Sequence, residues 1–293
     1  MTYAPKRIPR RLMLNLRGLP HSVTTWGDPA SSPVFLLHGW GDSSDTFQFL
    51  VDSSTADRHW IALDWRGFGD TPGAGPTYWF PDYFADLDAL LELYTPGQPA
   101  VVIAHSMGGN VASMYAGIRL HRIARLINLE GIGLPRTRPE DAPDRYGRWL
   151  EALRSEPTFS VYPSIEEFAA LLHRRNPAMP MANARFVAKY WLKPCAEGYT
   201  LRWDPAHKRV NPVLFSREGL EACWRASTAP TLLVLGGLSD LRLALGRDGD
   251  PSSFEGVYPQ IRVHVLPQAG HLMHIEEPDI LAALIDAFMD ERR

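Results

Sequence analysis

Short apolar runs alternate with longer amphipathic stretches along most of this 293-residue chain. The runs are rich in β-branched residues and lie at 12–16, 33–37, 60–63, 101–104, 126–129, 231–235 and 261–266. Each is short enough to be a strand buried on both faces, which predicts a parallel sheet with helices on both sides. The amphipathic stretches predict helices over 81–94, 107–121 and 278–292.

This alternation stops between Leu129 and Thr231. The segment of about a hundred residues contains many aromatic and charged side chains but no convincing strand. Helical patterns over 164–175 and 182–191 fit this segment better. We therefore expect a helical cap over 131–228, inserted into a core formed by 1–130 and 229–293. The insert has 15 Lys and Arg against 11 acidic residues, a net charge of +4, while the rest of the chain carries −7.

Composition narrows the class of protein further. With 45% apolar and 22% charged residues, the chain resembles an ordinary globular protein, and a net charge of −3 argues against binding nucleic acid. Its two cysteines, Cys195 and Cys223, show no spacing typical of zinc, so we expect a reducing compartment. The N-terminus lacks the apolar region of a signal peptide, and no stretch approaches 18 apolar residues. These features predict a cytoplasmic protein without a membrane span.

The run VVIAHSMGGN, at 101–110, carries the strongest chemical signal. A buried strand pattern ends at Ser106, and a helical pattern begins at the next residue. A serine in such a turn has strained backbone and an exposed hydroxyl, which are the features of a nucleophile elbow. The small residues Ala104 and Gly108 let the strand and helix approach each other, although the usual pattern has glycine at both places.

A second strand pattern ends in FLLHGWGD, at 35–42. An acyl-transfer site needs two N–H donors directed at the oxygen that becomes negative, and the backbone amides of Trp40 and Met107 are the expected pair. We interpret His38 as a core residue. The Trp40 side chain is the first candidate for the substrate pocket, and His105 is a second.

Two further strand patterns end in residues that complete a catalytic triad. Asp240 follows the run at 231–235, and His271 follows the run at 261–266. Serine is a poor nucleophile until an imidazole accepts its proton, and the imidazole needs a carboxylate to fix its tautomer. Ser106, Asp240 and His271 supply these groups. Glu130, which also follows a strand, is the alternative acid, because any carboxylate that reaches His271 Nδ1 meets the requirement.

In this order and spacing, the four motifs resemble those of the α/β-hydrolase family over nearly the whole chain. The loop DWRGFGDT at 64–71 and the Gly-His near the C-terminus are also similar to that family's motifs. Residues 202–208 resemble the cap of serine hydrolase-like proteins. The resemblance implies an α/β, doubly wound, mostly parallel eight-stranded sheet with a cap inserted after the sixth strand.

The resemblance and the triad together predict a serine hydrolase that cleaves a small ester or lactone through an acyl-enzyme on Ser106, with no metal and no organic cofactor. A serine at this position argues against dehalogenases and epoxide hydrolases, which need a carboxylate there. Two alternatives stay open: a hydrolase of carbon–carbon bonds, and a small-molecule receptor on the same fold. No oligomeric state is predicted.

The expected partner is an apolar or aromatic small molecule. Charged residues of the insert could also bind an anionic molecule. The candidates for such a site are Arg202, Asp204, Lys208 and Arg209. The alternative is that these four side chains form ion pairs within the cap.

Overall fold

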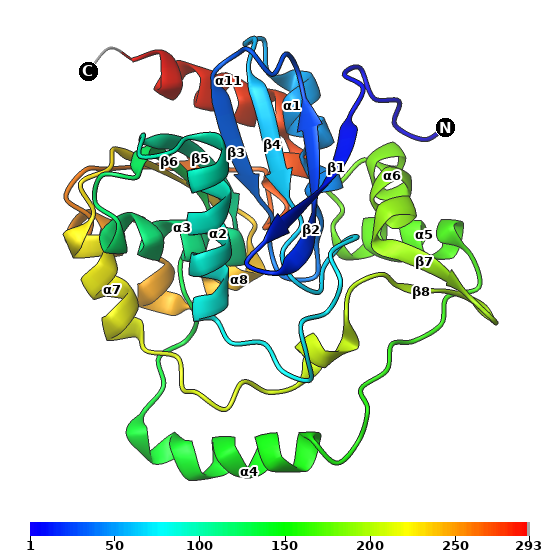
Figure 1. Ribbon diagram of the computed structural model, residues 1–293. Helices are drawn as coiled ribbons and strands as arrows, with labels where there is room; N and C mark the ends of the chain where they lie inside the picture. Colours follow the sequence, from blue (N-terminus) through cyan, green and yellow to red (C-terminus); the bar gives the residue numbers. More distant parts are fainter. Residues whose placement is uncertain (292–293) are drawn as a thin grey trace.

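An eight-stranded sheet forms the centre of the computed structural model, which describes residues 1–291 (Figure 1). Its strands are β1 (Arg10–Leu16), β2 (Leu19–Trp26), β3 (Pro33–Leu37), β4 (His59–Leu63), β5 (Ala100–His105), β6 (Ile123–Leu129), β9 (Thr231–Gly236) and β10 (Ile261–Leu266), while β7 (Leu192–Cys195) and β8 (Gly198–Leu201) form a separate antiparallel pair. The order across the sheet is β1-β2-β4-β3-β5-β6-β9-β10. β2 pairs antiparallel with β1 and β4, and the other pairs are parallel.

Helices cover both faces of this sheet. The helices within 1–291, those of the cap included, are α1 (Gln48–Ser53), α2 (Pro81–Tyr94), α3 (Met107–Ile118), α4 (Ala142–Ala152), α5 (Ile165–Arg175), α6 (Met181–Trp191), α7 (Arg217–Ala226), α8 (Asp240–Ala244), α9 (Pro251–Glu255), α10 (Met273–Glu276) and α11 (Pro278–Asp290). Successive strand residues face opposite ways, so Phe35 packs with the core under α2 and α3, and Leu36 with the core under α1 and α11. The doubly wound α/β prediction is confirmed.

All seven predicted strands and all three predicted helices are present, with ends that differ by a few residues. α3 stops at Ile118, short of the predicted end at 121. α11 reaches Asp290, and the last residue of its predicted range, Arg292, lies outside the described residues. β2 escaped prediction because it buries polar side chains such as His21 and Thr24. Hydrophobic periodicity does not reveal such a strand.

The insert holds α4, α5, α6 and a small hairpin of β7 and β8. The two helical patterns predicted within it correspond to α5 and α6, and Ser164 caps α5 by accepting a hydrogen bond from Glu167 N. The hairpin was not expected. α7, the last helix of the predicted 131–228 segment, packs against α3, and Trp224 Nε1 donates to Ser113 Oγ at 3.0 Å. This helix therefore belongs to the layer that covers the sheet.

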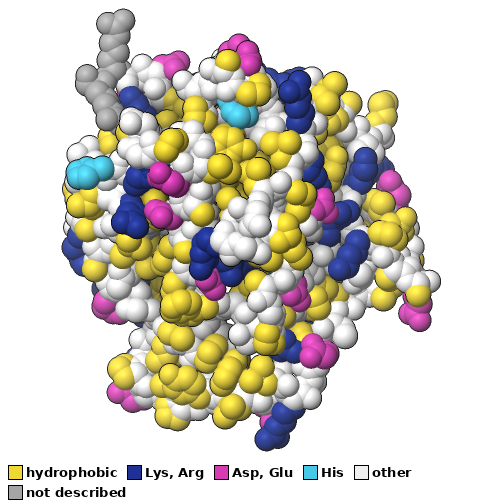
Figure 2. All heavy atoms as spheres, viewed as in Figure 1, with side chains coloured by type: hydrophobic (Ala, Val, Ile, Leu, Met, Phe, Trp, Pro, Cys, Tyr) yellow, Lys and Arg dark blue, Asp and Glu magenta, His cyan; other side chains and the backbone are white. Residues whose placement is uncertain are grey.

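α4 stands apart from the rest of the cap (Figure 1). None of its residues is buried, although its sequence is amphipathic. Tyr146 and Leu150 lie one turn apart and are both more than half exposed. Figure 2 shows hydrophobic side chains gathered over this helix. The cap thus contains one well-packed part, α5 and α6, and one helix with an exposed apolar face.

A buried carboxylate ties α2 to the loop after β4. Asp86 Oδ2 accepts from Arg66 Nε at 2.7 Å, and Oδ1 accepts from Arg66 Nη2 at 2.7 Å and from Arg17 Nη1 at 3.0 Å. Burial alone would raise the pKa of Asp86, but contacts with His21 and Arg66 outweigh it and lower the pKa to about 2. The carboxylate form is thus strongly favoured in the folded protein.

Asp86→Asn is expected to destabilise the protein at pH 7 by about 3 kcal/mol, because the substitution leaves a buried arginine without its charge partner. Since folding lowers this pKa, the stabilisation is complete above about pH 4 and disappears as the pH falls toward 2. The difference from wild type should shrink by about 2 kcal/mol over that range. Urea unfolding at several pH values measures it.

Glu92→Gln, an exposed change on the same helix, is the control. Equal unfolding free energies for the two variants at pH 7 would contradict the assignment.

Candidate active site

Ser106 lies between β5 and α3 with φ 51° and ψ −116°, a strained conformation for a residue other than glycine. Its N–H donates to Leu129 O at 2.8 Å, and its carbonyl accepts from Asn110 N at 2.9 Å. Gly108 has no room for a side chain, because a Cβ there would lie 2.5 Å from Leu37 O. The structure thus has the strand–turn–helix geometry that the sequence predicted around Ser106.

His271 connects the serine to a carboxylate. Its Nε2 lies 2.9 Å from Ser106 Oγ, and its Nδ1 lies 2.6 Å from Glu130 Oε2. A carboxylate can only accept, so the ring proton is on Nδ1, and Nε2 is free to accept from the serine hydroxyl. The three side chains form a continuous chain of hydrogen bonds.

Glu130 is held by three donors. Gly236 N donates to Oε1 at 2.6 Å, while Ser239 Oγ and His271 Nδ1 each donate to Oε2 at 2.6 Å. The residue is buried, and its φ of 54° turns the chain at the end of β6. Ser239 was not among the predicted site residues, because nothing in the pattern distinguishes it from its neighbours as a partner of the acid.

The preferred assignment of Asp240 as the partner of His271 is wrong. Asp240 is exposed, and its side chain makes no hydrogen bond or ion pair with any residue within 1–291. Ser239 caps α8, and Asp240, the first residue of that helix, lies on its solvent side. The alternative acid, Glu130, occupies the position beside His271.

The two predicted oxyanion donors flank the serine. Met107 follows Ser106 as the first residue of α3, and Trp40 follows Gly39, whose missing Cβ would lie 3.0 Å from Ser106 Cβ. Neither the Trp40 nor the Met107 amide has a hydrogen-bond partner in the part of the chain that the structure describes. Both N–H groups are therefore available beside the serine.

Aromatic rings join the loop after β3, which carries Trp40, to the cap. The Trp40 side chain is about half exposed, and its ring meets Trp203 edge to face with centroids 4.6 Å apart. Trp203 also packs against Phe68 and Phe159. The arrangement forms an apolar wall between the core and the cap, on the Trp40 side of the serine.

His38 and His105 have supporting positions. His38 donates from Nδ1 to Gly39 O at 2.7 Å and accepts at Nε2 from Trp65 N at 3.0 Å, in line with its interpretation as a core residue. His105, the other pocket candidate, is buried, and its Nε2 donates to His271 O at 2.8 Å. Burial and the neighbouring histidines hold the pKa of His105 well below its usual range. Its ring supports His271 from the protein interior instead of forming an exposed pocket wall.

The four charged candidates for anion binding have partners inside the molecule. Those contacts are Arg202 with Asp70, Asp204 with Tyr78, Lys208 with Thr158 O, and Arg209 with Glu156. Only the contact of Arg209 with Glu156 is an ion pair within the cap, and Arg202 pairs instead with Asp70 of the core.

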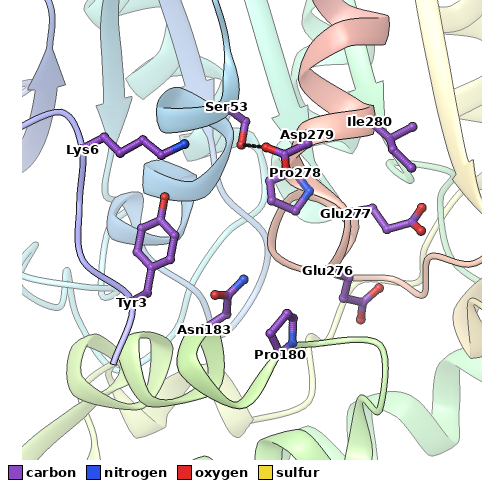
Figure 3. Close-up of a pocket in the computed structure, with 10 residues that line it drawn as sticks. All are labelled: Tyr3, Lys6, Ser53, Pro180, Asn183, Glu276, Glu277, Pro278, Asp279 and Ile280. Carbon is purple, nitrogen blue, oxygen red and sulfur yellow. Dashed lines mark hydrogen bonds between the residues drawn. The ribbon is translucent and has the colours of Figure 1, made fainter. Parts of the chain in front are cut away.

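A cavity of ≈ 370 Å³ lies behind the active site, between the N-terminal segment, α6 and the start of α11. Figure 3 shows Glu276 among its lining residues, with Lys6 and Asn183 on other walls; none of the three hydrogen-bonded site residues lines it. Glu276 accepts from Gly270 N at 2.5 Å, and burial raises the pKa of its carboxyl. Glu276 thus holds the loop that carries His271, and the cavity that Glu276 lines is separate from Ser106.

Comparison with known proteins assigns the chain to a family. The model of the alpha/beta hydrolase family matches residues 34–284. The chain belongs to the α/β-hydrolase family. No helix within 1–291 is long and apolar enough to cross a membrane.

Relatives are named as hydrolases. A serine hydrolase-like protein of Danio rerio is 35% identical over 118 residues, which are 40% of this chain and 36% of that protein. Esterase YbfF of Escherichia coli (strain K12) is 26% identical over 286 residues, which are 96% of this chain and all of the relative. The thioesterase domain from the curacin biosynthetic pathway superposes with a TM-score of 0.83 at 23% identity, over 95% of this chain and 99% of that one, and supports the fold. The chain is thus a hydrolase.

Glu130→Gln is expected to lower kcat for p-nitrophenyl acetate by roughly 10³- to 10⁴-fold, because the amide does not stabilise the imidazolium. Asp240→Asn is the matched control and should retain activity within about twofold, as expected for an exposed site. Steady-state kinetics of both variants decides between the two acids. A large loss in Asp240→Asn with none in Glu130→Gln would reverse the assignment.

Proposed function

We propose that this hydrolase cleaves a small carboxylic ester or lactone through an acyl-enzyme on Ser106. The observation that carries the proposal is the chain of hydrogen bonds from Glu130 through His271 to Ser106, 2.6 and 2.9 Å long. This is the arrangement that a serine nucleophile needs at neutral pH.

In the acylation step, Ser106 Oγ attacks the ester carbonyl carbon while its proton passes to His271 Nε2. The imidazolium is stabilised by Glu130, whose Oε2 already accepts a hydrogen bond from Nδ1, with 2.6 Å between the two atoms. His271 then protonates the leaving alcohol as the carbon–oxygen bond breaks. The products of this step are the free alcohol and an acyl group on Ser106.

The negative charge that develops on the carbonyl oxygen is met by the amides of Trp40 and Met107. Each such donor lowers the barrier by about 3 kcal/mol in comparable sites. Water then attacks the acyl group, with His271 accepting its proton, and the carboxylic acid is released. In a lactone, the leaving alcohol stays attached to the acyl group, so the product is a hydroxy acid.

The aromatic wall supports an apolar or aromatic substrate. Trp40 and Trp203 offer ring surfaces beside the oxyanion donors, and the charged candidates of the cap are paired elsewhere. The name of the full-length relative, an esterase, agrees with a neutral ester substrate.

Wild type should be labelled by a fluorophosphonate probe, with loss of fluoride and a covalent bond to Ser106 Oγ. Ser106→Ala should not be labelled, and its kcat should fall by roughly 10⁵-fold or more. A p-nitrophenyl ester series from acetate to octanoate, run on the wild type, should peak at one chain length. Gel fluorescence and steady-state rates measure both effects.

Labelling without turnover of any ester would instead support the receptor alternative. Full ester turnover in Ser106→Ala would contradict the proposed nucleophile.

Gly39→Ala tests the oxyanion loop. The new methyl group would lie 2.9 Å from His105 Nδ1 and 3.0 Å from Ser106 Cβ, so the loop that carries the Trp40 amide must shift. We expect kcat to fall roughly 10- to 100-fold with a smaller change in KM, because an oxyanion donor acts in the transition state.

The matched control is Gly147→Ala on α4, where the methyl group meets nothing within 4 Å. If the two variants retain the same kcat, the proposed position of the oxyanion site is wrong.

A further inference from the structure

Three buried side chains converge behind His271. Asp42 follows β3, His105 ends β5, and His274 lies on α10, so they come from distant parts of the sequence. One ligand atom from each lies within 4.8 Å of those of the other two. All three are at least nine-tenths buried.

His105 offers an unprotonated ring nitrogen to this cluster. Its Nε2 is 2.8 Å from the carbonyl oxygen of His271, which can only accept, so Nε2 carries the proton. Nδ1 is therefore a bare lone pair. It is buried and has no hydrogen-bond partner among residues 1–291.

The same reasoning applies to His274. Its Nε2 lies 3.3 Å from Thr46 Oγ1, whose own proton is directed to Asp42 Oδ2 at 2.9 Å or Ser43 O at 3.1 Å. The threonine oxygen thus accepts from Nε2–H, and the same nitrogen lies 3.7 Å from Asp42 Oδ2. Nδ1, the other ring nitrogen of His274, is buried without a hydrogen-bond partner in the described chain.

Asp42 supplies the charge. Its oxygens accept from Ser43 N at 2.7 Å, Trp191 Nε1 at 2.8 Å and Thr46 Oγ1 at 2.9 Å, which favours the carboxylate form. Two imidazoles and one carboxylate form a donor set that binds Zn²⁺ and related divalent ions in other proteins.

We propose that Asp42, His105 and His274 bind a divalent transition metal ion such as Zn²⁺, and that the bound ion inhibits the hydrolase from behind its catalytic histidine. The binding site stands on these three residues alone. Only the inhibition rests on the proposed function.

Inhibition follows from what each ligand touches. Zinc–ligand bonds of about 2.1 Å place neighbouring ligand atoms about 3.4 Å apart, so a cluster as wide as 4.8 Å must contract when the ion binds. His105 holds His271 O and precedes Ser106, and its Nδ1 faces Gly39 in the oxyanion loop. The contraction therefore displaces the groups that position the serine, the base and one oxyanion donor. kcat should fall with little change in KM.

The experiment adds Co²⁺ to the wild-type protein and follows the visible absorption of a low-symmetry nitrogen and oxygen site. Zn²⁺ should abolish the signal by competition, and it should inhibit ester hydrolysis reversibly on addition of a chelator. A chain whose Ser106 is already phosphonylated should give the same Co²⁺ spectrum, because the proposed site does not include the serine. Loss of the signal after phosphonylation would place the ion at His271 Nε2 and overturn the proposal.

His274→Gln should weaken Zn²⁺ binding by roughly 100-fold or more, since even loss of an outer partner costs about 10- to 100-fold. The matched control is His121→Gln at an exposed position, which should leave the affinity unchanged. Cu²⁺ EPR of the wild type gives an independent count of bound imidazoles in case the buried variant does not fold. Two nitrogens are expected. The absence of any Co²⁺ or Cu²⁺ signal in the wild type would overturn the site, as would equal affinities in folded His274→Gln and His121→Gln.

Discussion

The carboxylate of Glu130 connects the parts of the chain that make up the active site. It stands at the end of β6 and accepts hydrogen bonds from Gly236 and Ser239 at the end of β9 and from His271 after β10. These three segments are neighbours only because the sheet orders β6, β9 and β10 side by side. The orientation of His271, and hence the contact of its Nε2 with Ser106, depends on this one buried group.

Close packing explains why the acid comes from β6. A Cβ on Gly236 would lie 2.3 Å from Gly270 O, and one on Gly237 would lie 2.5 Å from Pro267 O. The backbone after β9 is therefore pressed against the loop that carries His271. The chain then turns into α8 with Ser239 directed inward and Asp240 outward. Glu130 approaches from the adjacent strand, where a left-handed backbone turns its side chain toward the imidazole.

Local patterns predicted most of the fold, since apolar strands and amphipathic helices depend on periodicity within a few residues. They also located Ser106, which directly follows β5, and His271, which lies a few residues after β10. β2 was missed because its buried His21 and Thr24 are satisfied by tertiary contacts that the local pattern does not encode. The choice between Asp240 and Glu130 failed for a related reason. Both follow strands, and only the packing of Gly236 on Gly270 distinguishes them.

The histidines near the site show how tautomers divide structural from reactive roles. His38 uses both ring nitrogens in hydrogen bonds to backbone groups, so its orientation is fixed and neither nitrogen is free to react. His271 uses Nδ1 on a carboxylate and keeps Nε2 for the serine. His105 and His274 each use Nε2 on an oxygen, and their Nδ1 atoms have no hydrogen-bond partner among the described residues. A bare buried nitrogen weakens a fold unless something binds it. Both residues lie in the cluster with Asp42, and His105 directly precedes the nucleophile, so a bound cation would satisfy a group that packing leaves without a partner among the described residues.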